Sequence, residues 1–129
     1  MLTTGIRGRA SCPVTAQNTA AAVGSGALEV FATPVLAALV EEAAWKSVQP
    51  GLEPGCGTVG TALRLNHTAA TPVGGTVIAE CELVEIDRRR LVFRFTVRDG
   101  AGPVADGEHE RFIVRSESFL AKARARSQA

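Results

Sequence analysis

Residues 31–48, "FATPVLAALVEEAAWKSV", carry the strongest secondary-structure signal in the chain. Thr33 is a favoured capping residue, and Pro34 suits the first helical position, where its missing N–H costs nothing. The predicted helix runs to about Val48 and ends before the turn at residues 49–51. Apolar residues occupy nearly every position instead of one stripe, so we expect protein to surround this helix on most sides.

After this helix the hydrophobic period changes from 3.6 residues to 2, which is typical of strands. The short connections "DRRR" and "DGAGP" predict antiparallel hairpins. A long apolar helix followed by four antiparallel strands indicates an α+β protein in which a curved sheet wraps a central helix, the hot-dog fold. An open sheet edge favours pairing with a second copy, so we expect a homodimer. The predicted strands are Thr58–His67, Thr76–Asp87, Leu91–Arg98 and Val104–Arg115.

The two ends of the chain are less strongly patterned. Residues 1–28 contain a candidate strand near Ala10–Ala16, followed by "NTAAAVGSGAL", which we interpret as a flexible loop or lid. The tail Ser118–Arg126 fits a short basic helix. The length suits one domain, so we interpret residues 1–129 as a single hot-dog domain.

Composition excludes several classes of function. A net charge of +1 argues against nucleic acid as a partner. The longest mainly apolar stretch, Val35–Val48, is too short to span a bilayer, and no basic-then-apolar segment opens the chain. The three cysteines lack metal-ligand spacing, so we expect reduced thiols, no metal and a cytoplasmic location.

A histidine ends the first predicted strand, in "LRLNHTAATP" (residues 63–72). Leu63, Leu65 and His67 share one face, because strand side chains alternate. An imidazole at a strand end, before a loop of small residues, fits a cleft wall, and its ordinary pKa lies near working pH. The alternative is a core histidine whose ring nitrogens are both bonded to backbone.

Two adjacent carboxylates, Glu41 and Glu42, interrupt the apolar helix. Adjacent helical residues point about 100° apart, so at least one of them should be partly buried. Burial disfavours a lone carboxylate, which favours a functional role for one of the pair. Alternatively, one is solvated and the other bonds a backbone group.

Thr33 lies about two turns, ~12 Å along the axis, before Glu41. A hydroxyl at the start of a helix lies among free N–H groups, where developing negative charge is favoured. The alternative role of Thr33 is that of a plain helix cap.

The glycine pattern "GCGTVG" (residues 55–60) matches dinucleotide-binding loops. Such a loop should follow a strand and open a helix, whereas here it follows a turn and opens an alternating strand. We therefore do not expect a nucleotide fold.

Several segments together resemble the fluoroacetyl-CoA thioesterase family of hot-dog proteins. They are "EVFATP" (residues 29–34), Glu41, "LEPGCGTVGTA" (residues 52–62) and "HTAATP" (residues 67–72), with a looser match to "GEHERF" and "FLAKAR". The resemblance implies hydrolysis of a short acyl-CoA thioester, with no cofactor beyond the coenzyme A of the substrate. It implies catalytic roles for Thr33, Glu41 and His67, and substrate contacts at the backbone N–H of Gly60 and at Arg111.

In this mechanism Glu41 acts as base or transient nucleophile, His67 moves a proton and Thr33 positions the acyl carbonyl. All three should converge on one pocket. We then expect Glu42 to be a solvated neighbour and His109 an ordinary strand residue.

Two segments give predictions about the substrate: residues 24–28 about its acyl group, and Arg88–Arg90 about its coenzyme A phosphates. Family members that discriminate fluoroacetyl groups carry an aromatic lid before "EVFAT", whereas this chain has "GSGAL" (residues 24–28). We therefore expect another small acyl group or a broader range. Arg88–Arg90 either meet CoA phosphates or form a solvated charge run. A non-catalytic module that binds acyl-CoA or another small ligand is the main alternative, and a hydratase ranks third.

Overall fold

The helix predicted from residues 31–48 is α2 (Thr33–Val48) in the computed structural model, which describes residues 1–127. The side of α2 that includes Ala38 and Trp45 is exposed. The expectation that protein surrounds α2 on most sides is therefore wrong for the single chain. The buried side chains form one stripe, namely Leu36, Leu39, Val40, Ala43, Ala44 and Val48.

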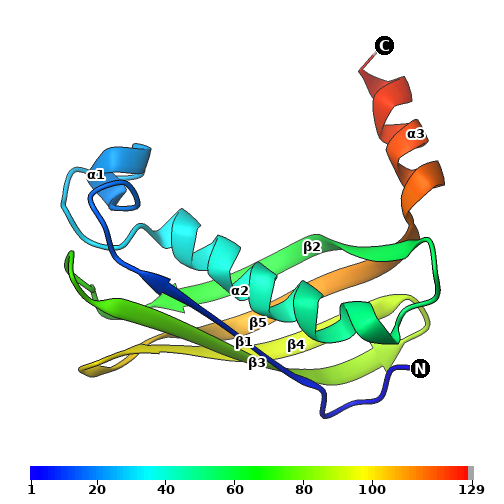
Figure 1. Ribbon diagram of the computed structural model, residues 1–129, viewed down its shortest axis with the longest axis horizontal. Helices are drawn as coiled ribbons and strands as arrows, with labels where there is room; N and C mark the ends of the chain where they lie inside the picture. Colours follow the sequence, from blue (N-terminus) through cyan, green and yellow to red (C-terminus); the bar gives the residue numbers. More distant parts are fainter. Residues whose placement is uncertain (128–129) are drawn as a thin grey trace.

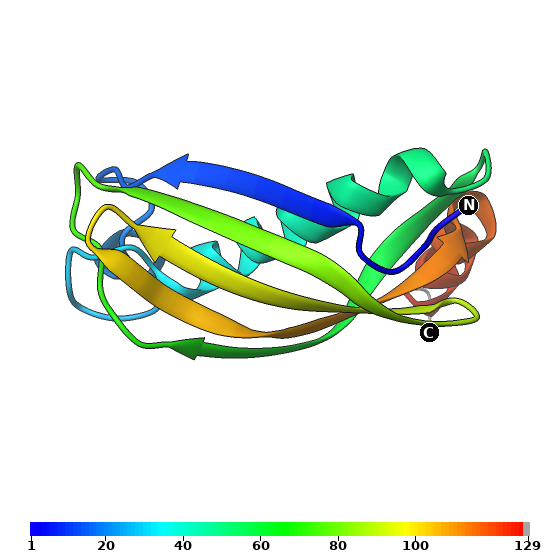
Figure 2. The same ribbon diagram turned by 90° about the horizontal axis from the view of Figure 1, so that it is seen from below.

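Five strands form one antiparallel sheet in the order β1-β3-β4-β5-β2 (Figure 2). The β3–β4 and β4–β5 hairpins confirm the predicted antiparallel connections. β2 does not pair with β3, which follows it in sequence, but lies at the far edge beside β5. The strands are β1 (Arg7–Pro13), β2 (Cys56–His67), β3 (Thr76–Asp87), β4 (Arg90–Asp99) and β5 (Gly102–Arg115).

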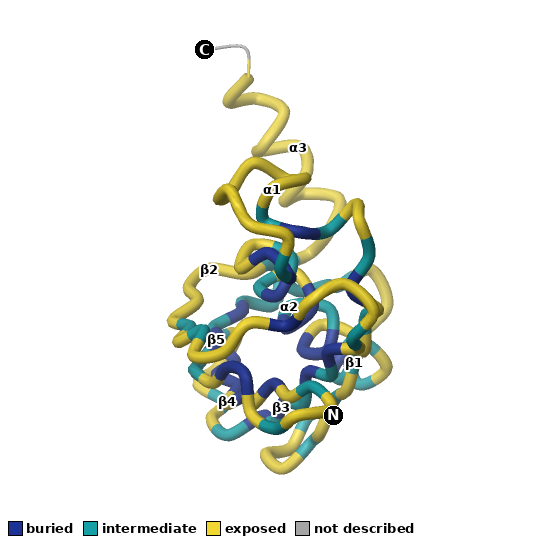
Figure 3. The backbone as a smooth tube through the Cα atoms, turned by 90° about the vertical axis from the view of Figure 1, so that its left-hand side faces the viewer, coloured by how far each residue is buried: buried dark blue, intermediate teal, exposed yellow. Residues whose placement is uncertain are grey.

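The sheet curves around α2, so the arrangement is the predicted hot-dog fold (Figure 1). The short helix α1 (Ala20–Val23) lies at one end of α2, and the single turn η1 (Gln49–Gly51) follows α2 at the other end. From that second end α3 (Ser116–Arg126) extends away from the sheet (Figure 1) and is exposed along its whole length (Figure 3). None of the helices within residues 1–127 is long and apolar enough to cross a membrane.

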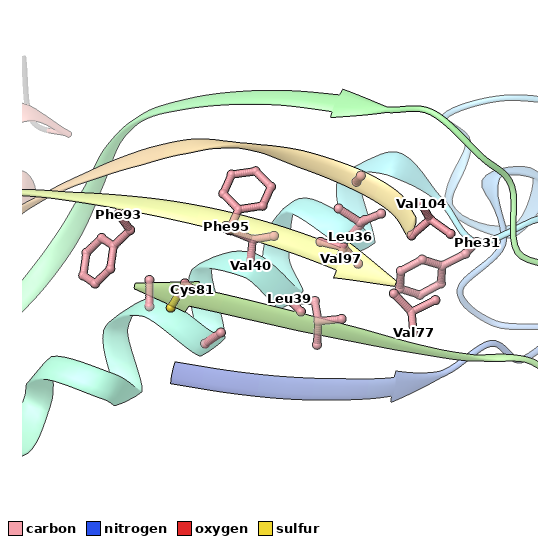
Figure 4. Close-up of a cluster of buried hydrophobic side chains, with 14 of the residues drawn as sticks. Phe31, Leu36, Leu39, Val40, Val77, Cys81, Phe93, Phe95, Val97 and Val104 are labelled. Atoms are coloured by element: carbon pink, nitrogen blue, oxygen red, sulfur yellow. The ribbon is translucent and has the colours of Figure 1, made fainter. Parts of the chain in front are cut away.

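The core fills the space between α2 and the concave face of the sheet (Figure 4). Phe93 and Phe95 of β4 and Leu36 of α2 are almost fully buried there, with exposures of 1% or less. Fully burying a side chain of this size contributes about 1.5–3 kcal/mol relative to leaving it exposed. This packing fixes α2 over the sheet whose strands β5 and β2 carry the other candidate site residues.

The N-terminal region differs from the prediction in two places. β1 covers Arg7–Pro13, earlier than the predicted Ala10–Ala16, and its pairing with β3 sets its position. The segment interpreted as a loop contains α1, whose N-cap Thr19 accepts a hydrogen bond from the Ala22 N–H. Small residues gave no periodic signal there, and the turn is bounded by the Thr19 cap and by Gly24 in the left-handed conformation.

Candidate active site

Thr33 and His67 are joined by a hydrogen bond of 2.8 Å between Thr33 Oγ1 and His67 Nδ1. The N-cap of α2 is Ala32, so Thr33 is the first helical residue and its side chain does not cap the helix, contrary to the prediction. The loop after His67 is held beside the start of α2 because the Phe31 N–H donates to the Thr71 carbonyl. The fold therefore brings together two residues that are far apart in sequence.

The second ring nitrogen of His67, Nε2, is buried and has no hydrogen-bond partner among the described residues. Leaving a buried polar atom unsatisfied costs about 1–3 kcal/mol. The alternative of a core histidine with both nitrogens bonded to backbone is therefore wrong. Unsatisfied buried polar groups are rare and call for an explanation, and a catalytic role is one.

The Thr33–His67 pair opens into a shallow pocket of about 310 Å³. The lining comes from α1, the start of α2 and the loop after β2, and most of its side chains are small. The lining residues are Ala20, Ser25, Val30, Phe31, Thr33, His67, Thr68, Ala69 and Ala70.

Glu41 lies in a second cluster with two residues of β5. Its Oε2 lies 3.2 Å from Arg111 Nη1 and 3.9 Å from His109 Nε2. The Glu41 side chain is 43% exposed, whereas Arg111 and His109 are 7% and 1% exposed. An ion pair with one buried partner thus holds the carboxylate, which still faces solvent.

Hydrogen bonds to β2 hold two of the three nitrogens of the Arg111 guanidinium. Its Nε donates to Thr58 Oγ1 at 2.8 Å and its Nη2 donates to the Thr58 carbonyl at 3.0 Å. Burial lowers the pKa of Arg111, while the charge of Glu41 acts in the opposite direction. Whether Arg111 also contacts substrate stays a prediction.

Gly60 lies directly against this cluster. A Cβ on Gly60 would lie 2.5 Å from Glu41 Oε2 and 3.3 Å from Arg111 Nη1. The β2–β5 register shifts immediately after Gly60, between Gly60 and Ala62. Only glycine leaves room for the carboxylate to occupy this position.

The two clusters do not meet within one chain. The hollow beside Glu41 and Arg111 shares no residue with the pocket at Thr33 and His67. Glu41 lies ~12 Å along α2 from Thr33, as the rise per residue requires. The expectation that all three catalytic residues converge on one pocket is therefore wrong for a single chain.

The predictions for Glu42, next to Glu41, and for His109, close to Arg111, had different outcomes. Glu42 pairs with Lys46 at 2.9 Å and is 45% exposed, as expected of a solvated neighbour. His109 is not an ordinary strand residue, because it touches both Arg111 and Glu41. The missed signal was its spacing: His109 lies two residues before Arg111, so the two share one face of β5.

One arginine of the run Arg88–Arg90, at the β3–β4 hairpin, is held in ion pairs. Arg90 forms ion pairs with Glu85 and Glu110, at 2.8 Å and 2.5 Å. Within this run, binding of CoA phosphates stays a prediction for Arg88 and Arg89. Among residues 1–127, no group of three or more histidine, cysteine or acidic side chains is placed to hold a metal ion.

The curved sheet around one long helix, with a threonine–histidine pair at the start of that helix and a carboxylate two turns later, defines a hot-dog protein of the thioesterase class. The family model described as fluoroacetyl-CoA-specific thioesterase matches residues 14–117. The fluoroacetyl-CoA thioesterase of Streptantibioticus cattleyicolor is 44% identical over 101 residues, which are 78% of this chain and 73% of that protein. This chain belongs to the fluoroacetyl-CoA-specific thioesterase family.

Solved structures agree with this assignment. A threonine-to-serine variant of the fluoroacetyl-CoA thioesterase FlK, in complex with acetyl-CoA, matches with a TM-score of 0.91 and 35% identity, covering 97% of this chain and 98% of that one. A thioesterase superfamily member from Thermus thermophilus matches with a TM-score of 0.91 at 22% identity, covering 99% and 95% of the two chains. The second likeness supports the fold alone.

Proposed function

We propose that this protein is an acyl-CoA thioesterase that hydrolyses short-chain acyl-CoA to the free acid and coenzyme A. The observation that carries the proposal is the Thr33–His67 hydrogen bond beside a pocket, with the second ring nitrogen of His67 left without a partner. The family and the relative that acts on fluoroacetyl-CoA support it. So does the related structure that holds acetyl-CoA.

In the proposed mechanism, Thr33 and His67 act on the acyl carbonyl and the moving proton. The Thr33 hydroxyl lies at the start of α2, where the helix favours developing negative charge on the carbonyl oxygen. The imidazole of His67 transfers the proton that the attack releases. The thiolate of coenzyme A is a good leaving group, so attack and oxyanion stabilisation dominate the barrier.

Glu41 supplies the attacking group. Its carboxylate either removes a proton from water or attacks the thioester and forms a transient anhydride that water then cleaves. Both routes need the carboxylate in one fixed position. Arg111 and the open space at Gly60 provide that position.

We propose that a homodimer completes the site, because the two clusters are separate in one chain. β2 is an edge strand, and Gly60–Arg64 form a continuous exposed stretch near its middle. If two copies pair antiparallel along β2 with the two-fold axis at Arg64, so that each Arg64 lies opposite its own copy, His67 lies opposite the register shift between Gly60 and Ala62 of the partner subunit. Each of the two sites would then combine Thr33 and His67 of one subunit with Glu41 and Gly60 of the other.

The acyl group is the finer part of the proposal. The segment interpreted as a loop or lid, residues 18–28, contains no aromatic residue, and most side chains that line the pocket are small. We expect acetyl-CoA and fluoroacetyl-CoA to be hydrolysed with kcat/KM values within about tenfold of each other, because one small apolar difference changes selectivity by little. We place the activity in the cytoplasm, with the three cysteines unpaired and without a metal or further cofactor.

The test is release of the coenzyme A thiol from a panel of acyl-CoAs, which a thiol reagent detects. Glu41→Gln and His67→Ala should each lower kcat at least 100-fold. Glu42→Gln is the matched control on the same helix and should keep wild-type activity, because Glu42 is half-exposed and pairs with Lys46 one turn further along α2. Tight binding of acyl-CoA without thiol release would instead identify a non-catalytic binding module.

A further inference from the structure

His109 is a polar residue inside the hydrophobic core. It lies on the inner face of β5, is 2% exposed and stacks against Phe93 with ring centroids 6.2 Å apart. A phenylalanine or leucine would fill such a position at lower cost, because a buried polar ring must find hydrogen bonds. Filling space in the core therefore does not by itself account for an imidazole at this position.

The neighbours of His109 specify one protonation state. Its Nδ1 lies 2.9 Å from the Ala62 carbonyl, which only accepts, so Nδ1 carries the hydrogen. Its Nε2 lies 3.1 Å from Arg111 Nη1, which only donates, so Nε2 is the bare acceptor. Burial and the Arg111 charge lower the pKa of His109, although the Ala62 hydrogen bond and Glu41 act against this. The ring is thus a neutral link from the β2 backbone to the guanidinium.

The contact with His109 completes the set of acceptors around Arg111. Nε and Nη2 donate to Thr58, and Nη1 lies within hydrogen-bond distance of both Glu41 and His109. A guanidinium is planar, so acceptors on both edges fix its rotation and its depth. His109 is the acceptor that keeps Nη1 turned toward Glu41.

We infer that His109 is a positioning residue for the hydrolysis, acting through Arg111 to hold the Glu41 carboxylate against Gly60. The inference rests on the proposed function, because its effect is on the rate of thioester cleavage. Without an acceptor at this place, one N–H of a side chain that is only 7% exposed is unsatisfied and the guanidinium turns away from Glu41.

Two substitutions of His109 separate its hydrogen bond with Arg111 from its hydrogen bond with Ala62. His109→Gln places an amide oxygen near the position of Nε2 and keeps an acceptor for Arg111, whereas His109→Asn places an amide nitrogen near Nδ1 and keeps only the bond to Ala62. We expect His109→Gln to retain kcat within about threefold and His109→Asn to lower it at least tenfold, with KM nearly unchanged in both. Both are assayed at a temperature at which each variant is folded, as checked by its melting curve.

A cycle with Glu41→Gln shows whether the effect passes through the carboxylate. In that background His109→Asn should change the residual rate by less than twofold, since the group it positions is already lost. Equal rates for the Gln and Asn variants, or a full additional loss in the Glu41→Gln background, would overturn the inference. Absence of thiol release by the wild-type protein would instead refute the proposed function.

The wild-type protein provides a test that does not depend on the folding of any variant. Nitrogen NMR shifts of the histidine rings at neutral pH should show His109 as the neutral tautomer with the hydrogen on Nδ1. Observation of the Nε2–H tautomer, or of a charged ring, would overturn the inference, because neither form can accept from Arg111.

Discussion

Thr33 lies one position inside α2, and this one-residue shift decides what its hydroxyl does. At the N-cap the hydroxyl would accept a hydrogen bond from a first-turn N–H. As the first helical residue it is bonded to His67 instead. The cap position is filled by Ala32, which has no polar side chain, so the start of the helix gives up cap stability of roughly 1 kcal/mol.

At the residue scale the sequence singled out candidate catalytic side chains, whose roles stay predictions, and missed how they are held. Spacing and the family resemblance indicated Thr33, Glu41 and His67. The supporting contacts of Thr58 and His109 with Arg111 depend on the β2–β5 register, which strand alternation does not determine. A role for His109 could therefore not be derived before the two strands were paired.

Gly60→Ala tests whether the carboxylate needs the space at Gly60. The new methyl would displace the end of a flexible side chain, so we expect kcat to fall at least tenfold while the melting temperature changes little. Gly57→Ala is the matched control in the same strand, because its Cβ would meet its nearest neighbour, Ser116 Oγ, at an ordinary 3.4 Å. Unchanged thiol release by Gly60→Ala would show that the position of Glu41 is not critical.

The buried His109 predicts how stability depends on pH. Burial and the Arg111 charge lower its pKa below the ordinary 6.5, so the unfolded chain binds this proton more readily than the folded one. Its contribution to the free energy of unfolding is complete above about pH 6.5 and is lost as the pH falls toward the folded-state pKa. The charged groups around the ring are Arg111, which lowers the pKa of His109, and Glu41 and Glu110, which raise it together with the Ala62 hydrogen bond.

Urea unfolding at about pH 7.5 and about pH 5.5 measures this dependence. The loss of stability on acidification should be smaller in His109→Gln than in the wild type, since all other titratable groups are the same in the two proteins and cancel in the comparison. An identical loss in the two proteins would contradict a neutral, buried His109.

At the scale of elements, hydrophobic periodicity identified α2 and all four C-terminal strands, but it did not identify their order in space. β2 crosses to the edge beside β5, and this placement puts Gly60 and His67 on an open edge. Periodicity is a local property, whereas strand order depends on contacts between distant parts of the chain. The exposed side of α2 was missed for a related reason. An apolar residue in the sequence does not show whether protein or solvent lies over it.

Leu63→Asp tests the β2 edge as the dimer interface. Leu63 lies next to the proposed two-fold axis and is 36% exposed in the single chain, so each introduced carboxylate would face its own copy. We expect sedimentation to show a shift from dimer to monomer, with thiol release falling in parallel. Ser11→Asp, on the opposite edge strand β1, is the matched control and should stay dimeric and active. A dimeric, active Leu63→Asp protein would rule out this edge.

At the scale of the whole molecule, the two clusters of candidate residues lie at different places along the same helix. Thr33 and His67 lie at the α1 end of α2, and Glu41, Gly60 and Arg111 lie nearer its middle. In the proposed dimer, a two-fold axis across β2 would bring the Thr33–His67 cluster of one copy beside the Glu41 cluster of the other. On this proposal one helix carries residues of two different sites.

Mixing two inactive variants tests this account most directly. Glu41→Gln and His67→Ala are co-expressed so that heterodimers form, and thiol release is compared with that of each variant alone. If the sites combine residues of both subunits, each heterodimer has one intact site and one doubly altered site, and random pairing restores about a quarter of the wild-type activity. No recovery from verified heterodimers would contradict the shared site, because every site would then still carry one substitution.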